Sequence, residues 1–181
     1  AHEDDANGTA SGSAYIFGKS NGRWSQVAKV LASDGQAGDK YGWSVGISDE
    51  TAIIGARARV DNGARSGAAY VVELSNGAWA QTAKLLPLDG AANDEFGWSV
   101  AVSGQTIVVG APGNGDLGPR SGSAYLFTRV DGQWQQSAKL IPQDGAANDY
   151  FGYSVSISGD TVIVGAYGRD DIGDLSGAAY I

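Results

Sequence analysis

Residues 94–111 read DEFGWSVAVSGQTIVVGA, and this stretch decides the fold. It holds an aromatic-glycine step, two short alternating runs joined by a tight turn, and a closing Gly-Ala. The same pattern stands 55 residues earlier as DKYGWSVGISDETAIIGA, residues 39–56, and 55 residues later as DYFGYSVSISGDTVIVGA, residues 149–166. A fixed period of this length indicates a repeat architecture, in which each repeat is one supersecondary unit.

Each repeat predicts four β-strands and no helix. In the central copy we expect strands A to D over Gly97–Ser103, Thr106–Ala111, Ser123–Arg129 and Trp134–Ile141, because these runs alternate or are rich in β-branched residues. Four antiparallel strands repeated in register are typical of a β-propeller blade, so the sequence predicts an all-β propeller segment over 1–181. Its predicted parts are a partial blade over 1–38, blades over 39–93 and 94–148, and a partial blade over 149–181.

The composition excludes several classes of protein. The chain has no Cys and a single His, His2, so no thiol site, catalytic triad or multi-histidine metal site can be built, and we predict that it is not an enzyme. The formal net charge of −8 argues against nucleic acid as a partner, because nucleic-acid binding requires a basic surface. No apolar run has the length of a membrane span, so we expect no membrane insertion.

The repeated motif resembles a known family. Aromatic-glycine steps occur at Tyr41-Gly42, Phe96-Gly97 and Phe151-Gly152, and the central copy closes with Gly110-Ala111-Pro112, whereas the other copies have Arg57 and Tyr167 at the last position. This pattern resembles the FG-GAP repeat of integrin α-subunit propellers and of many bacterial surface proteins. The resemblance implies an extracellular or cell-surface module for recognition or adhesion, with a protein or carbohydrate ligand. Rings of this family usually have about six or seven blades, so we expect further blades from a longer chain or, alternatively, from another subunit.

The resemblance does not carry over the calcium site of the family. In many members an aspartate-rich loop between strands A and B surrounds Ca²⁺ with oxygen ligands. Here that connection is only Ser48-Asp49-Glu50, Ser103-Gly104-Gln105 or Ser158-Gly159-Asp160, which is too short to wrap an ion.

Most of the 20 acidic residues lie instead in the D-to-A and B-to-C loops, which leave a four-stranded meander at the same end. Three interpretations stay open for them: local turn formation by Asp side chains, a Ca²⁺ site, or contact with a partner. The candidate metal ligands are the D-G-x-x-x-D pairs Asp34 and Asp39, Asp89 and Asp94, and Asp144 and Asp149, together with Asp170, Asp171 and Asp174 of the RDDIGD segment.

Two further sets are candidate ligand-binding residues. Asp61, Asp116 and Arg169 lie in B-to-C loops, which differ between repeats and therefore suit specific recognition. Trp43, Trp98 and Tyr153 share one repeat position, where they either stack on sugar rings or pack between blades. We expect Lys29, Lys84 and Lys139 on the solvent side of strand D. The sequence thus predicts a recognition module that uses its acidic loop face; the alternatives are a lectin-like propeller and an accessory domain of a secreted enzyme.

Overall fold

The computed structural model describes residues 1–181 except 172 and 174, and the described residues form strands without any helix. This confirms the predicted all-β class. The strands are β1 (Ala14–Ser20), β2 (Arg23–Val30), β3 (Ser44–Ser48), β4 (Thr51–Ala56), β5 (Ala68–Ser75), β6 (Ala78–Leu85), β7 (Ser99–Ser103), β8 (Thr106–Ala111), β9 (Ser123–Val130), β10 (Gln133–Leu140), β11 (Phe151–Ser158), β12 (Thr161–Ala166) and β13 (Ala178–Tyr180).

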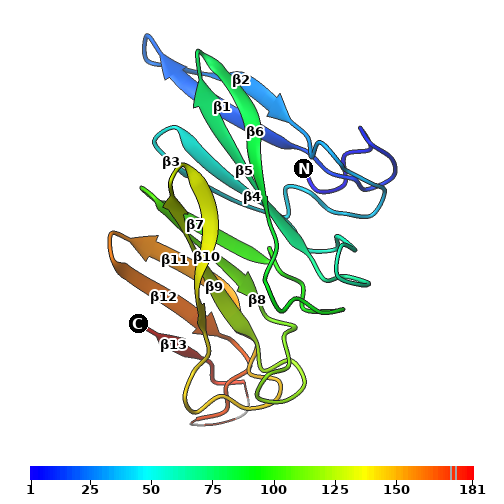
Figure 1. The fold of residues 1–181 in the computed structure, drawn as a ribbon, viewed down its shortest axis with the longest axis vertical. Helices are drawn as coiled ribbons and strands as arrows, with labels where there is room; N and C mark the ends of the chain where they lie inside the picture. The colour runs from blue at the N-terminus through cyan, green and yellow to red at the C-terminus, as the bar shows by residue number, and fades with distance from the viewer. Residues whose placement is uncertain (172, 174) are drawn as a thin grey trace.

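These strands form four antiparallel sheets that follow one another in chain order (Figure 1). Two complete sheets, β3 to β6 and β7 to β10, each contain strands A to D. The first sheet, β1 and β2, supplies strands C and D, and the last, β11 to β13, supplies strands A to C. The arrangement is that of partial and complete propeller blades. Strand β7 begins at Ser99 rather than at the predicted Gly97, which has a φ of 86°.

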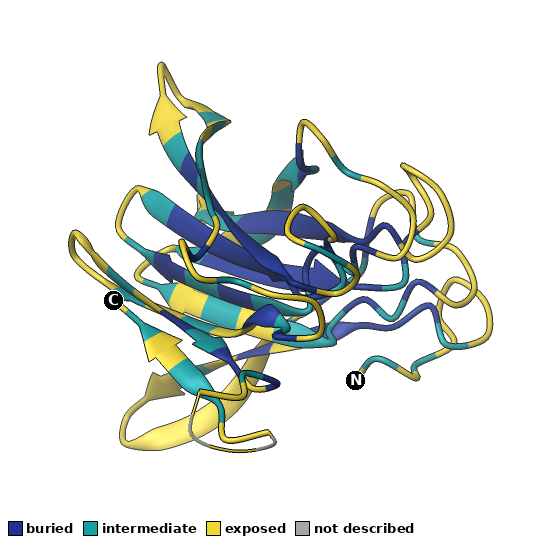
Figure 2. Ribbon diagram, turned by 90° about the horizontal axis from the view of Figure 1, so that it is seen from below, coloured by how far each residue is buried: buried dark blue, intermediate teal, exposed yellow. Residues whose placement is uncertain are grey.

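The hydrophobic core of the described residues lies between the sheets, in three clusters. Figure 2 shows that the buried residues lie mainly on the strands, whereas most of the loops are exposed. The cluster between the two complete blades joins Ile53 and Val71 of one blade to Val100 and Ile107 of the next. The second strand of each complete blade, β4 or β8, is buried along almost its whole length, as expected for a strand covered on both faces. Each blade therefore depends on its neighbour to bury its apolar face.

The glycines of the repeated motif lie where backbones of adjacent blades meet. Gly67 forms a parallel bridge with Phe96, and Ser44 Oγ donates to the carbonyl of Gly97 at 2.8 Å. A Cβ on Gly55 would lie 2.0 Å from that same carbonyl oxygen. The Gly-Ala step of one blade thus packs against the aromatic-glycine step of the next, and this contact explains why both steps recur.

The first strand of the first complete blade has an exposed apolar face. Val45 and Ile47 are 64% and 59% exposed, whereas their repeat counterparts Val100 and Val102 are each 8% exposed beneath the preceding blade. A cavity of about 300 Å³ lies over this face, lined by β1, β3 and β4. These open sheets are consistent with completion of the propeller by other blades.

This difference in exposure gives a first prediction. Val100→Ala should lower the free energy of unfolding by about 2 kcal/mol, because it removes buried methyl groups and leaves a cavity. Val45→Ala should change it by no more than about 0.5 kcal/mol, because its side chain is already in contact with solvent. Urea denaturation followed by Trp fluorescence measures both. Equal losses in the two variants would mean that the β3 face is covered in solution.

Candidate functional site

The B-to-C and D-to-A loops meet at one end of the sheets, hereafter the loop end, as the meander topology predicts. Residues of the β2–β3 loop, such as Asp34 and Asp39, contact Arg59 in the β4–β5 loop. The short A-to-B and C-to-D hairpins lie at the other end. Acidic residues, aromatic rings and most ion pairs of the described chain gather at the loop end.

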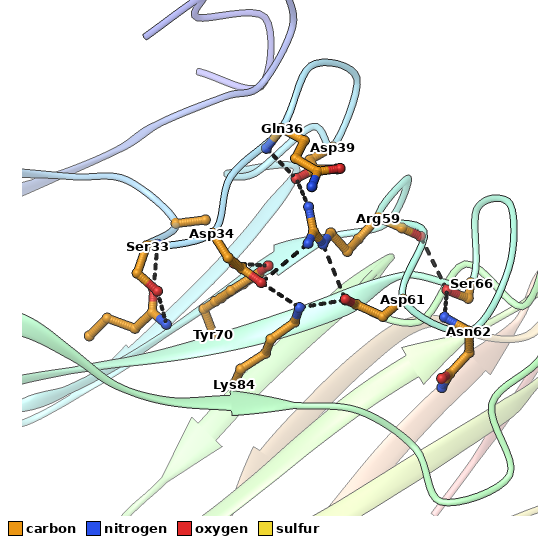
Figure 3. A network of polar contacts seen from close by, with 12 residues as sticks. Ser33, Asp34, Gln36, Asp39, Arg59, Asp61, Asn62, Ser66, Tyr70 and Lys84 are labelled. Atoms are coloured by element: carbon orange, nitrogen blue, oxygen red, sulfur yellow. Dashed lines mark hydrogen bonds and ion pairs between the residues drawn. The ribbon is translucent and has the colours of Figure 1, made fainter. Parts of the chain in front are cut away.

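Arg59 is the centre of the polar network at the first complete blade (Figure 3). Its guanidinium donates to three carboxylates: Nη1 to Asp39 at 2.8 Å, Nε to Asp61 at 3.2 Å and Nη2 to Asp34 at 3.3 Å. The side chains of Arg59 and Asp39 are only 7% and 3% exposed. Burial opposes the charge on Arg59, but the hydrogen bonds that it donates to Asp39 and Asp61 outweigh this effect and hold the pKa of Arg59 above its ordinary value.

Lys84 and Tyr70 complete this network. Lys84 Nζ lies 2.7 Å from Asp34 and 2.5 Å from Asp61, and the Tyr70 hydroxyl donates to Asp34 at 2.9 Å. The expectation that Lys84 stands in solvent is therefore wrong: its side chain is 21% exposed, because two carboxylates draw the ammonium back onto the loop end. Lys139, which is 16% exposed, is placed in the same way.

The last sheet repeats the arrangement around Arg169. Its Nη1 donates to Asp149 at 3.0 Å, Nη2 to Asp144 at 3.1 Å and Nε to Asp171 at 2.7 Å. Asp170 accepts from the backbone N–H of Leu175 at 2.6 Å. The remaining predicted ligand of this segment, Asp174, lies outside the described residues.

The central blade keeps the three carboxylates but replaces the arginine with Asn114. Asn114 Nδ2 donates to Asp94 at 3.3 Å, and Lys139 Nζ contacts both Asp89, at 2.6 Å, and Asp116. Burial raises the pKa of Asp94 above its ordinary value, and the hydrogen bonds from the Ala91 N–H and Asn114 do not offset it. Burial would also raise the pKa of Asp89, but Lys139 outweighs it and leaves that pKa lowered.

One aspartate of each pair also forms a local turn, as the sequence suggested. Asp39, Asp94 and Asp149 each accept a hydrogen bond from the backbone N–H three residues earlier, at 2.8, 2.9 and 2.8 Å. Among the described residues, no group of three or more acidic or His side chains is placed to hold a metal ion. Calcium binding by the predicted residues therefore stays a prediction, which calorimetric titration with Ca²⁺ checks.

The aromatic residues form a continuous row across the blades at the loop end. Ring centroids are 5.3 Å apart between Trp43 and Trp98, 5.1 Å between Trp98 and Tyr153, and 4.5 Å between Tyr153 and Tyr167. The first three are the predicted aromatic candidates, and their contacts show packing between blades. Tyr153 and Tyr167 remain 39% and 48% exposed, so the row also faces solvent.

Arg57 links this aromatic row to the charged loops. Its guanidinium carbon lies 3.9 Å from the ring centroid of Trp43 and 4.6 Å from that of Trp98, and Nη1 donates to Glu95 at 2.8 Å. Arg65 contacts the same carboxylate. Sequence reasoning missed Arg57, Arg59, Tyr70 and Lys84 as members of the site. The 55-residue period could have indicated Arg59, Tyr70 and Lys84, because the Tyr and Lys positions recur in other repeats and Arg59 recurs as Arg169.

Comparison with models of known protein families shows the family of this chain. A family model described as FG-GAP repeat matches residues 24–72, 79–127 and 134–181. The chain belongs to the FG-GAP repeat family. Each match begins on strand D of one blade and ends in strand C of the next or directly after it, so the family unit contains the D-to-A loop and its aspartate pair. A comparison with curated proteins finds no match. The described residues contain no helix long and apolar enough to cross a membrane.

The burial of Asp94 gives a prediction about pH. The pKa of Asp94 is higher in the folded state than in the unfolded state, where it is about 3.8. Protonated Asp94 therefore contributes fully to the free energy of unfolding below pH 3.8, and this contribution is lost as the pH rises through the folded-state pKa. Asp94→Asn should therefore be more stable than the parent at pH 7 and equal to it below pH 3.8. Asp89→Asn, which removes a partner of Lys139, should lower stability at pH 7 by at most about 1 kcal/mol. Denaturant midpoints across this pH range measure both; a less stable Asp94→Asn variant at pH 7 would contradict the assignment.

Proposed function

We propose that this chain is a non-catalytic recognition module of an extracellular or cell-surface protein and that it binds its ligand at the loop end. The observation that carries the proposal is the row of partly exposed rings at Trp43, Trp98, Tyr153 and Tyr167. Trp and Tyr provide large, rigid contact area and are the residues that dominate binding energy at protein interfaces. FG-GAP propellers often serve in binding, which agrees with this role.

The charge of the surrounding loops favours a protein partner with basic groups. The carboxylates of Asp89, Asp144 and Asp171 remain 47% to 53% exposed although each has a cationic neighbour. With a formal net charge of −8, the chain attracts cationic ligands at long range, most strongly at low salt. The single His2 packs on Trp43, 4.9 Å between ring centroids, which supports a structural rather than a catalytic role.

A glycan is the second candidate, and the same aromatic row favours it. Sugar rings stack on exposed aromatic rings, and the partly exposed rings of Tyr153 and Tyr167 lie next to each other. Arg57 and Glu95 next to the row provide hydrogen-bonding groups for hydroxyls.

Glycan-array screening of the chain and of Trp98→Ala, each with and without Ca²⁺, separates the two candidates. Glycan binding that is lost in Trp98→Ala would identify a lectin-like propeller and exclude the protein-only role. Absence of glycan binding leaves the protein partner, for which binding should weaken at least tenfold in Trp98→Ala and fall with rising salt. Trp24→Ala is the matched control, because Trp24 lies on β2, is 68% exposed and is outside the aromatic row.

A further inference from the structure

The central blade has no arginine at the centre of its carboxylate cluster, unlike the blades on either side. Arg59 and Arg169 provide a guanidinium in the flanking blades, whereas Asn114 occupies the same repeat position in the central one. The three carboxylates are retained as Asp89, Asp94 and Asp116. The central cluster thus has three acidic groups and one cation, Lys139.

The flanking blades show how this set of carboxylates holds a guanidinium. In both, the buried aspartate accepts from Nη1, the first aspartate of the pair from Nη2, and the loop aspartate from Nε, at 2.7 to 3.3 Å. The planar guanidinium of arginine directs its N–H donors at all three carboxylates at once, which the compact ammonium of lysine cannot do. The same arrangement occurs in both blades that have arginine at this repeat position.

Asn114 reproduces only the innermost part of that arrangement. Its Nδ2 reaches Asp94, and its Oδ1 accepts from Ser123 Oγ at 2.9 Å. Ser123 accompanies this substitution, because the two arginine-containing blades have alanine there, Ala68 and Ala178. The amide therefore stays on Asp94, and the outer two carboxylates lack the donors that Nε and Nη2 provide elsewhere.

A buried hydroxyl in this cluster is also left incompletely bonded. Tyr125 is fully buried, and its hydroxyl lies near Asp89 and Lys139 but forms no hydrogen bond of normal length and angle with a described residue. Its counterparts Tyr70 and Tyr180 donate to Asp34 and Asp144 at 2.9 and 3.1 Å. The side chain of Asp116 is 39% exposed, between the 21% of Asp61 and the 47% of Asp171, so its carboxylate is accessible to solvent.

We propose that the central blade binds a guanidinium group from outside, the arginine side chain of a partner protein, between Asp89 and Asp116. The inference rests on the proposed recognition role, for which it names the partner chemistry. The incoming group takes the position of the missing Nε and Nη2 donors beside Lys139. It restores the positive charge that the flanking blades contain.

The test is titration of the whole chain with N-acetyl-argininamide, followed by amide chemical shifts. We expect one site with a dissociation constant on the order of 1–10 mM, and at least tenfold weaker binding of N-acetyl-lysinamide. The double variant Asn114→Arg with Ser123→Ala copies the flanking blades, so it should fold and should weaken argininamide binding at least tenfold. The reverse variant, Arg59→Asn with Ala68→Ser, should create a second site.

Three results would overturn the proposal: no shift with argininamide up to about 50 mM, equal binding to the Asn114→Arg, Ser123→Ala variant, or no preference over lysinamide. Saturation of the same signals by Ca²⁺ with displacement of argininamide would identify a metal site instead. Trp98→Ala separates this inference from the proposed function, because it should weaken partner binding and leave argininamide binding unchanged.

Discussion

Replacing Gly110 with alanine is expected to lower the free energy of unfolding by about 3 kcal/mol or more, because the added methyl group would collide with the backbone of the next blade. A Cβ at this position would lie 2.0 Å from the carbonyl oxygen of Gly152 in the next blade and 2.3 Å from Ser99 Oγ. The first neighbour is backbone, which cannot move without separating the two blades. Because the φ of Gly110 lies outside the left-handed region, the cost arises from this contact and not from backbone strain.

Two control variants isolate the contact between blades. Gly165→Ala changes the same repeat position in the last sheet, where the close neighbour is the Ser154 side chain and not the backbone of another blade, so a smaller loss is expected. Gly115→Ala, whose nearest neighbour would be 3.6 Å away, should change stability by no more than about 0.5 kcal/mol. Guanidinium chloride denaturation ranks the three variants. A Gly110→Ala protein as stable as Gly115→Ala would show that adjacent blades are further apart than described.

The sequence predicted the strands of each blade but not the contacts that these glycines make between blades. The 55-residue period and the alternation of Val100 and Val102 were sufficient to predict four-stranded blades and their order. They could not show why Gly97 and Gly110 recur, because each glycine meets the backbone of a different repeat. Contacts between repeats depend on how blades pack, and no local pattern contains that information.

The candidate site was predicted in part for a similar reason. Turn chemistry and meander topology placed the aspartates together at the loop end, which the structure confirms. The cations that neutralise them come from other segments: Arg59 and Lys84 are 25 and 50 residues from Asp34. A lysine on an amphipathic strand is ordinarily a solvent-facing residue, so nothing in the local sequence of strand D indicates that Lys84 bends toward two carboxylates.

Replacing Arg59 with alanine is expected to lower the free energy of unfolding by about 3 to 5 kcal/mol, because it leaves the buried carboxylate of Asp39 without its cation. The Arg59–Asp39 pair is almost fully enclosed, so solvent does not screen the loss. Arg59→Lys should recover only part of it, since an ammonium cannot bond three carboxylates in one plane. Thermal and urea denaturation of the parent and both variants measure the difference.

The central blade provides the control for this prediction within the same molecule. Asn114 and Ser123 keep Asp94 buried with neutral donors, so Arg59→Asn combined with Ala68→Ser should be more stable than Arg59→Ala. If Arg59→Ala cost less than about 1 kcal/mol, the network would be an exposed surface cluster rather than a buried one. If the double variant were no better than alanine, neutral donors would not replace the guanidinium, and the central blade would need another source of positive charge. Stability of the loop end and the ligand chemistry of its central blade therefore depend on one repeat position, which has arginine in the two blades beside the central one and asparagine in the central blade itself.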